Sequence, residues 1–204
     1  MDQATIDNQI KHIVNFLREN HDRINYRHLK GMSPESRLFA EKIGDRFRQA
    51  VLKTPSFGKL STIEDPAVAI VLKTFRGYSD HEIPNASKAH RDSMGAENLI
   101  GNLLELYLAQ KMVPLGWIWC AGETVKKTDF IKPVRGEGYI ELQVKNRDNS
   151  ENSSSSSVRD GTNILKWFRS YSKKPETNWN NFPDQSVKSV VSEQDFHKFI
   201  RSLR

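Results

Sequence analysis

One predicted strand carries three polar side chains whose types and spacing could do chemistry. Residues 139–145 alternate between apolar and polar side chains, and this alternation predicts an extended strand. Successive side chains of a strand point to opposite faces, so Glu141, Gln143 and Lys145 share one face while the apolar residues face the core. Asp129 belongs to a shorter predicted strand upstream. Antiparallel pairing of these two strands would bring Asp129 within reach of the polar face.

An acid, an amide and an amine grouped in this way suit the metal-dependent hydrolysis of a phosphodiester bond. Mg²⁺ prefers hard oxygen ligands and keeps several waters, so one or two carboxylates with an amide oxygen can hold it. A bound metal lowers the pKa of a water and offsets charge on the phosphate. A lysine beside it, here Lys145, can orient that water and balance further negative charge.

The same residues also have a simpler interpretation. Alternating polar residues commonly form the solvent-facing side of an antiparallel strand. Asp129 alone could be a turn residue, and Glu97 near the start of a predicted helix is favourable for the helix dipole without any metal. The residue types alone therefore leave both interpretations open.

The elements that would position these residues follow from periodicity and from helix-start signals. Apolar residues at three- and four-residue spacing predict helices, and shorter apolar runs between Gly and Pro predict strands. Helices are expected over residues 6–17, 33–52, 65–75, 96–111, 162–172 and 192–203, strands near 117–119, 125, 129–131 and 139–145, and a loop over 77–91. Helices followed by short strands are typical of an α/β or α+β core.

Charge and composition narrow the class of protein. The 204 residues include a single cysteine, Cys120, which excludes an internal disulfide and a cysteine-based zinc site. No apolar run is long enough to cross a bilayer, so we expect no membrane association and a cytoplasmic location. The net charge of +6 favours an acidic partner such as nucleic acid.

The order of these features resembles the PD-(D/E)xK nuclease superfamily, specifically bacterial type II restriction endonucleases. The resemblance covers residues 92–182, and the stretch 141–169 is similar to the SinI and AvaII group. It implies an α/β (α+β) fold with a mixed central sheet flanked by helices and a helical N-terminal region. It also implies Mg²⁺-dependent cutting of both strands of duplex DNA at a short site, by a homodimer.

Two departures from the family pattern affect the expected site. Thr128 stands where the family name has Pro, which matters little because only the acid binds metal. Gln143 replaces the usual acid, and its neutral amide is a poorer ligand, so Glu141 or Glu97 is expected to restore the charge. The expected catalytic residues are Asp129, Gln143, Lys145, Glu97 and Glu141, with Asp129, Gln143 and Glu97 as metal ligands.

Basic, amide and hydroxyl residues that follow the site are candidates for contacts with DNA. Arginine can read guanine, asparagine can read adenine, and small hydroxyls can approach phosphates closely. The candidates are Arg147, Ser153, Ser154, Ser155, Arg159, Lys166, Arg169, Lys173, Lys174, Asn178 and Asn180. Residues 1–90 are expected to form a helical region for dimerisation or DNA clasping, and 91–204 the nuclease core, within one compact domain overall.

Two alternatives stay open at the level of sequence. One is a repair or mobile-element nuclease of the same superfamily that recognises structure rather than sequence. The other is a basic DNA- or RNA-binding module without catalysis. The six histidines lack zinc-site spacing, and no Walker loop or Gly-x-Gly-x-x-Gly occurs, so neither a zinc enzyme nor a nucleotide cofactor is expected.

Overall fold

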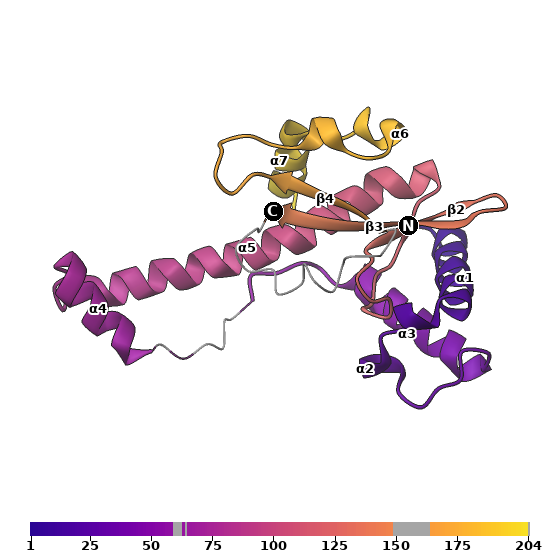
Figure 1. Cartoon of the computed structure of the whole chain (residues 1–204), viewed down its shortest axis with the longest axis horizontal. Helices are drawn as coiled ribbons and strands as arrows, with labels where there is room; N and C mark the ends of the chain where they lie inside the picture. Colours follow the sequence, from indigo (N-terminus) through magenta and orange to yellow (C-terminus); the bar gives the residue numbers. More distant parts are fainter. Residues whose placement is uncertain (59–62, 64, 149–163, 204) are drawn as a thin grey trace. The chain divides into compact units, whose positions relative to one another are not determined.

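The structure is a computed structural model of the chain, and it describes residues 1–58, 63, 65–148 and 164–203 (Figure 1). These residues form two compact units, Met1–Thr54 with Leu104–Arg204 and, separately, Pro55–Leu103. The first unit joins the N-terminal helices to the strands, so the division expected near residue 90 does not coincide with a boundary between the units. No helix among the described residues combines the length and hydropathy needed to cross a membrane.

The N-terminal part of the first unit is helical, as expected. It comprises α1 (Gln3–Glu19), η1 (His21–Arg23), α2 (Tyr26–Leu29) and α3 (Arg37–Leu52). Side-chain caps fix the helix starts: the Asp2 carboxylate accepts from the Thr5 N–H, and the Ser36 hydroxyl accepts from the Phe39 N–H. The start predicted at Ser33 is therefore three residues early, because Ser36 is the residue that caps α3.

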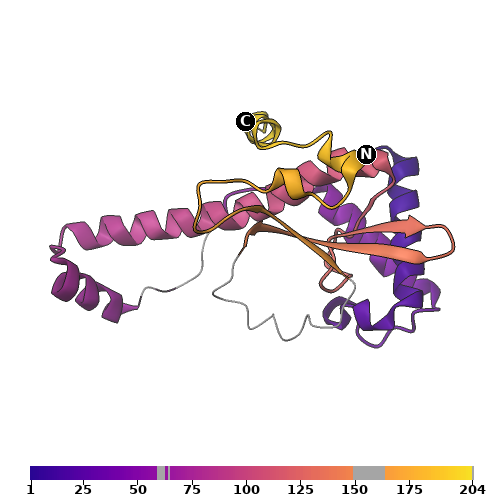
Figure 2. The ribbon, with the colours of Figure 1, turned by 45° about the horizontal axis from the view of Figure 1, so that its top comes forward.

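Four strands form one mixed sheet in the order β1-β2-β3-β4. They are β1 (Ile118–Trp119), β2 (Phe130–Val134), β3 (Gly138–Arg147) and β4 (Leu165–Ser170). The first three pair antiparallel, and β4 pairs parallel with β3 (Figure 2). The predicted mixed sheet, flanked by helices and preceded by a helical region, is confirmed.

The edge of β1 is covered by a side chain of α1. Gln9 is buried, and its amide donates to the Trp117 carbonyl at 3.2 Å and accepts from the Trp119 N–H at 2.7 Å. An amide side chain can satisfy both a donor and an acceptor of a strand edge. Gln9 therefore joins the N-terminal helices to the sheet in one unit.

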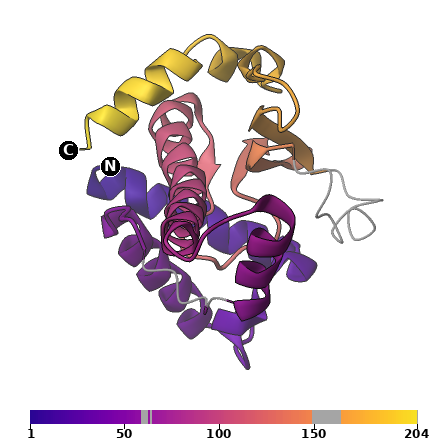
Figure 3. The ribbon, with the colours of Figure 1, turned by 90° about the vertical axis from the view of Figure 1, so that its left-hand side faces the viewer.

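One face of the sheet packs against the C-terminal elements of the chain. Leu142 and Val144 of β3 are buried on this face, whereas Ile140, also expected in the core, is exposed. Trp167 of β4 stacks on Trp179, with ring centroids 5.0 Å apart. The covering elements are η3 (Trp179–Asn181), α6 (Gln185–Lys188) and α7 (Glu193–Arg201), and Figure 3 shows α7 beside α5 (Glu82–Met112). A short η2 (Val113–Leu115) follows α5.

The segment 165–170 is a strand and not the predicted amphipathic helix. Its residues alternate between the two faces of the sheet, with Trp167 buried against the C-terminal elements. Aromatic residues suit a strand at least as well as a helix. Parallel pairing with β3 decides between the two structures, and a local pattern cannot show that pairing.

The second unit contains α4 (Pro66–Arg76) and the first part of α5. The prediction of a loop over residues 77–91 is wrong, because α5 begins at Glu82. The Glu82 carboxylate accepts from both the backbone and the hydroxyl of Ser79, which organises this helix start. Pro84 lies in the first turn, where its missing N–H costs no helical hydrogen bond.

Candidate active site

Asp129 immediately precedes β2 and is tied to β3 by two hydrogen bonds. Its N–H donates to the Leu142 carbonyl at 2.9 Å, although Phe130 is the residue that pairs with Leu142, so Asp129 and Phe130 both oppose Leu142, as in a β-bulge. An Asp129 oxygen accepts from the Val144 N–H at 2.7 Å, which fixes the carboxylate against β3.

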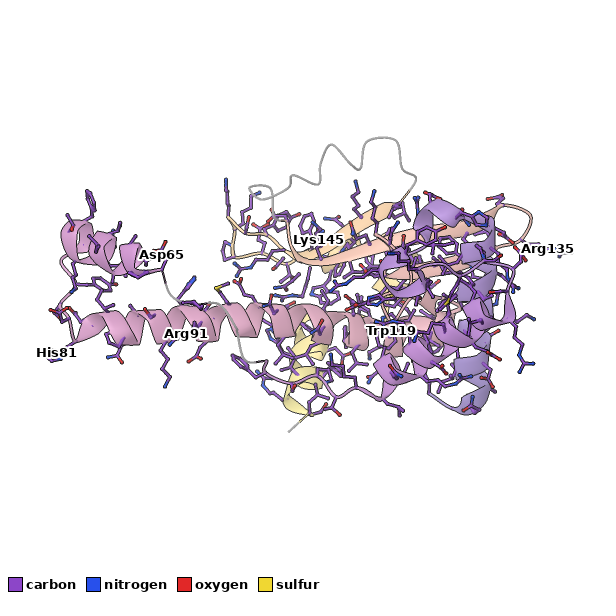
Figure 4. All side chains as sticks on the ribbon, turned by 90° about the horizontal axis from the view of Figure 1, so that it is seen from below. Asp65, His81, Arg91, Trp119, Arg135 and Lys145 are labelled. Carbon is purple, nitrogen blue, oxygen red and sulfur yellow. The ribbon has the colours of Figure 1, made fainter. Side chains whose placement is uncertain are left out.

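Gln143 and Lys145, two residues apart, lie on the same face of β3. The positive charge of Lys145 lowers the pKa of Asp129. Figure 4 shows Lys145 on the sheet. The charges of Asp129 and Lys145 are therefore close enough to interact, whereas the place of Gln143 in a site with them stays a prediction.

A fourth residue, Glu105 of α5, joins this group. Burial raises the pKa of Glu105 to about 7, and the neighbouring charge of Asp129 contributes to that rise. Burial likewise raises the pKa of Asp129 to about 6, against the lowering effects of the Val144 N–H and of Lys145. When two carboxylates lie close together and are partly buried, the ionisation of one disfavours the ionisation of the other.

Trp119 forms part of the surroundings of Glu105. Its indole group lowers the pKa of Glu105. No described residue, however, accepts a hydrogen bond of ordinary geometry from the buried Trp119 N–H. The Glu105 carboxylate thus has weak support from hydrogen-bond donors, which is consistent with its raised pKa.

The donor set fits a hard divalent cation. Two partly buried carboxylates carry more negative charge than Lys145 balances, and a bound cation would remove this cost. Among the described residues, no three or more His, Cys, Asp and Glu side chains form a metal-holding group. A cation here would therefore be held by the two carboxylates and by water, which is within the range of magnesium coordination.

Comparison with known proteins identifies the family of the chain. The family model of the SinI restriction endonuclease matches residues 1–203. The chain belongs to the SinI restriction endonuclease family. The resemblance inferred from the strand, the helix and the serine-rich stretch is thus confirmed, and the match also includes the N-terminal ninety residues.

Two type II restriction enzymes show how close the relationship is. The chain is 48% identical over 143 residues to the type II restriction enzyme Eco47I of Escherichia coli. It is 47% identical over 143 residues to the type II restriction enzyme SinI of Salmonella infantis. Each alignment covers 70% of this chain and 62% of the relative, so the chain matches less than two thirds of either relative's length.

In this SinI-family chain, Glu141 is engaged elsewhere. The Arg23 guanidinium binds both carboxylate oxygens of Glu141, at 2.7 and 3.0 Å, and the Thr128 hydroxyl donates to it at 2.7 Å. Both side chains of the ion pair are largely buried. Glu141 therefore lacks a free oxygen pair for a metal, and its expected role as the extra carboxylate does not fit the structure.

Breaking this ion pair should destabilise the protein. Because Arg23→Met leaves Glu141 buried without its partner, we expect the free energy of unfolding to fall by about 3 kcal/mol. Urea unfolding would measure this change, with Arg27→Met as the matched control because Arg27 is exposed. An Arg23→Met protein as stable as wild type would show that the pair carries no net stability.

Glu97, the other carboxylate expected at the site, is an exposed residue of α5 that belongs to the second unit. It precedes Glu105 by eight residues in the sequence of α5. The glutamate whose pKa is raised by the charge of Asp129 is Glu105. The sequence does contain a signal for Glu105. Two leucines of the apolar stripe precede Glu105, and Tyr107 and Leu108 follow it, so its carboxylate lies beside an apolar surface.

Two of the predicted DNA-contact residues are interior residues. The Arg169 guanidinium binds Glu193 of α7 and donates to Asn146 at 2.9 Å. Asn178 is buried, where its amide donates to the Phe168 carbonyl at 3.0 Å and its oxygen accepts from Tyr171. Both side chains hold the C-terminal elements on the sheet, so their expected role in reading DNA is not supported.

The remaining candidates differ in position. Arg147 is exposed at the end of β3, and Lys166 is exposed on β4. Lys173, Lys174 and Asn180 are exposed after β4. The predicted contacts at Ser153, Ser154, Ser155 and Arg159 lie outside the described residues.

Proposed function

We propose that this chain is a type II site-specific deoxyribonuclease. It hydrolyses phosphodiester bonds in both strands of duplex DNA at a short recognition sequence, in the cytoplasm of a bacterium, and it requires Mg²⁺. The observation that carries this proposal is the pair of partly buried carboxylates, Glu105 and Asp129, whose charges interact, with Lys145 near Asp129. Family membership and the similarity to two type II restriction enzymes support it.

Each residue has a distinct role in the proposed reaction. Glu105 and Asp129 supply the carboxylates that hold the cation, and Gln143 supplies an amide oxygen. When bound, the cation would lower the pKa of a water and offset the charge on the phosphate. Lys145 orients the attacking water and balances the negative charge that grows in the transition state.

A twofold homodimer is the proposed assembly. A symmetric DNA site cut in both strands is most simply met by two identical active sites related by a twofold axis. Each protomer would then supply one set of Glu105, Asp129, Gln143 and Lys145. Sedimentation of the protein with and without its duplex would test this assembly.

Digestion of a long unmethylated phage DNA tests the proposed function. We expect discrete fragments in Mg²⁺ and intact DNA in EDTA, and the fragment ends would give the recognition sequence. A smear would favour a nuclease without sequence specificity. Intact DNA with a retarded band in both conditions would favour the non-catalytic binding module and overturn the proposal.

Gln143→Glu tests the proposed ligand set by adding a carboxylate instead of removing one. A third carboxylate would bind a divalent cation more tightly, so we expect cleavage to persist with a lower requirement for Mg²⁺ or a changed metal preference. Titration of the cleavage rate with Mg²⁺ and Mn²⁺ would measure this. Gln194→Glu on α7 is the matched control. An unfolded Gln143→Glu protein, with a folded control, would mean that Gln143 is structural and that its assignment as a ligand is wrong.

A further inference from the structure

The segment 122–128, which leads into Asp129, is braced by the segment 23–28 of the N-terminal region. Three backbone contacts join the two segments. These are the antiparallel bridge between Ile24 and Val125, the Lys126 N–H that donates to the Arg23 carbonyl at 2.8 Å, and the Asn25 N–H that donates to the Thr124 carbonyl at 3.0 Å. Ile24 and Val125 are both buried, so the two segments meet in the core.

Side chains tie the same two segments to β3. The Arg23 guanidinium and the Thr128 hydroxyl both bind Glu141 of this strand. Consecutive Cα atoms are 3.8 Å apart, so the Cα of Lys127 lies at most about 7.6 Å from that of Asp129. The segment 122–128 therefore holds its side chains at a fixed place beside the proposed site.

Lys127 has a left-handed backbone conformation, with a φ of 63°. Residues other than glycine rarely adopt it, because Cβ then approaches the following carbonyl oxygen, so it persists only where the surrounding structure imposes it. Glu123, near the other end of the segment, is also left-handed, with a φ of 59°. Such conformations concentrate at active sites and ligand clamps. Here one of them presents an exposed lysine two residues before Asp129.

Three cations belong to the two braced segments and form a basic ridge, defined as Arg27, Lys126 and Lys127. Arg27 and Lys127 are exposed, and the Lys126 ammonium lies over the ring of Tyr26, 5.3 Å from its centroid. None of the three forms an ion pair with another described residue. Their charges are therefore available to an anionic ligand.

The surrounding charges leave this ridge positive. Asp22 forms an ion pair with Arg23, and Glu123 forms one with Arg46. Residues 55–103 contain five lysines and arginines against six aspartates and glutamates, although the whole chain has a net charge of +6. The excess of positive charge therefore belongs to the first unit, which also contains the basic ridge.

We infer that the basic ridge binds backbone phosphates of duplex DNA beside the phosphate that is cut. This inference rests on duplex DNA as the substrate in the proposed function, and it adds a contact surface to that function. Lysine and arginine neutralise phosphates without reading bases, so the ridge positions the duplex and does not select its sequence. Arg27 brings the N-terminal region into contact with the same DNA.

The salt dependence of DNA binding measures these contacts. Affinity for a short duplex is measured in Ca²⁺ at several KCl concentrations for wild type, Lys127→Gln and the triple variant Arg27→Gln/Lys126→Gln/Lys127→Gln. The slope of log Kd against log salt decreases by about 1 for each lost phosphate contact. We expect a decrease of about 1 for Lys127→Gln and of about 3 for the triple variant. Lys198→Gln, at an exposed lysine of α7, is the matched control and should keep the wild-type slope.

Lys127→Gly separates the lost charge from a disturbed backbone. Glycine adopts a positive φ without strain, so the Tm should not fall, while the salt slope should decrease as it does in Lys127→Gln. Single-turnover cleavage at saturating protein should stay within about threefold of wild type, because such contacts hold the substrate and the transition state equally. Slower cleavage at saturation with an unchanged salt slope would assign Lys127 a role in the active site and overturn the inference.

The outcomes separate this inference from the proposed function. If the triple variant keeps the wild-type slope while wild type cuts phage DNA in Mg²⁺, the inference is overturned and the proposed function stands. If the slopes decrease as expected but wild type leaves all DNA intact in Mg²⁺, the proposed function is overturned and the phosphate contacts stand. An equal decrease in Lys198→Gln and Lys127→Gln would mean that the net charge acts as a whole, and this would also overturn the inference.

Discussion

Replacing Glu105 with Gln is expected to abolish cleavage and, at the same time, to stabilise the metal-free protein at pH 8. The amide keeps the shape of the side chain but removes a buried negative charge beside Asp129. We expect the cleavage rate to fall at least about 10³-fold because a ligand of the cation is lost. Thermal unfolding in EDTA would show that Glu105→Gln is more stable than the wild-type protein.

The sign of the stability change follows from the direction of the pKa shifts. The pKa of Glu105 is raised to about 7 and that of Asp129 to about 6, so the folded protein holds protons that the unfolded chain releases near pH 4. The stabilising effect of these protons is complete below pH 4 and is lost as the pH rises to about 7. Above that range, the buried charges cost roughly 1–3 kcal/mol unless a cation binds.

Thermal unfolding at pH 5 and pH 8 checks this relationship. Mg²⁺ should raise the Tm of the wild-type protein more at pH 8 than at pH 5, where the carboxylates are largely protonated. Glu105→Gln should have the higher Tm in EDTA at pH 8 and a much smaller response to Mg²⁺. A gain of 1 kcal/mol corresponds to roughly 2–4 °C for a chain of this size. A lower Tm for Glu105→Gln at pH 8 would contradict the account of the buried pair.

Lys145→Ala is expected to cause the second large loss of cleavage activity. Cleavage should fall by at least about 10³-fold, while binding to duplex DNA in Ca²⁺ stays close to that of wild type. Lys145 acts on the attacking water and on charge that develops during the reaction, so its removal affects the transition state more than the bound ground state. Its charge also lowers the pKa of Asp129, so the residual activity should require a higher pH.

A matched lysine makes the Lys145→Ala experiment interpretable. Lys198→Ala removes the same charge from the exposed surface of α7 and should cleave at the wild-type rate. Single-turnover cleavage and a binding titration separate the two effects. If Lys145→Ala turned over like wild type, the assignment of the site to this face of β3 would be wrong.

The strand part of the site could be predicted because its signal is local. Alternation over 139–145 places Gln143 and Lys145 on one face, and the antiparallel pairing of β2 with β3 brings Asp129 next to β3, where it accepts from the Val144 N–H. The same reasoning included Glu141, because periodicity alone cannot distinguish a residue at the site from one held by a partner. The partner is Arg23, which lies 118 residues away in sequence.

The residues that sequence reasoning missed depend on long-range packing. Glu105 lies on a helix whose amphipathic pattern is visible in the sequence, but that pattern also includes the exposed Glu97 and does not show which of the two glutamates lies near Asp129. Lys166 was placed on a predicted helix, because the apolar residues around it satisfy both helical and strand spacing. Parallel pairing with β3 decides the structure there and sets Lys166 opposite Gln143.

The most direct test of the central claim compares two glutamates of the same helix. Wild type, Glu105→Gln and Glu97→Gln are incubated with the same unmethylated phage DNA in Mg²⁺, and the products are separated on a gel. We predict identical discrete fragments from wild type and Glu97→Gln and intact DNA from Glu105→Gln. Fragments from Glu105→Gln at the wild-type rate would contradict the assignment of the buried carboxylate pair as the catalytic metal centre.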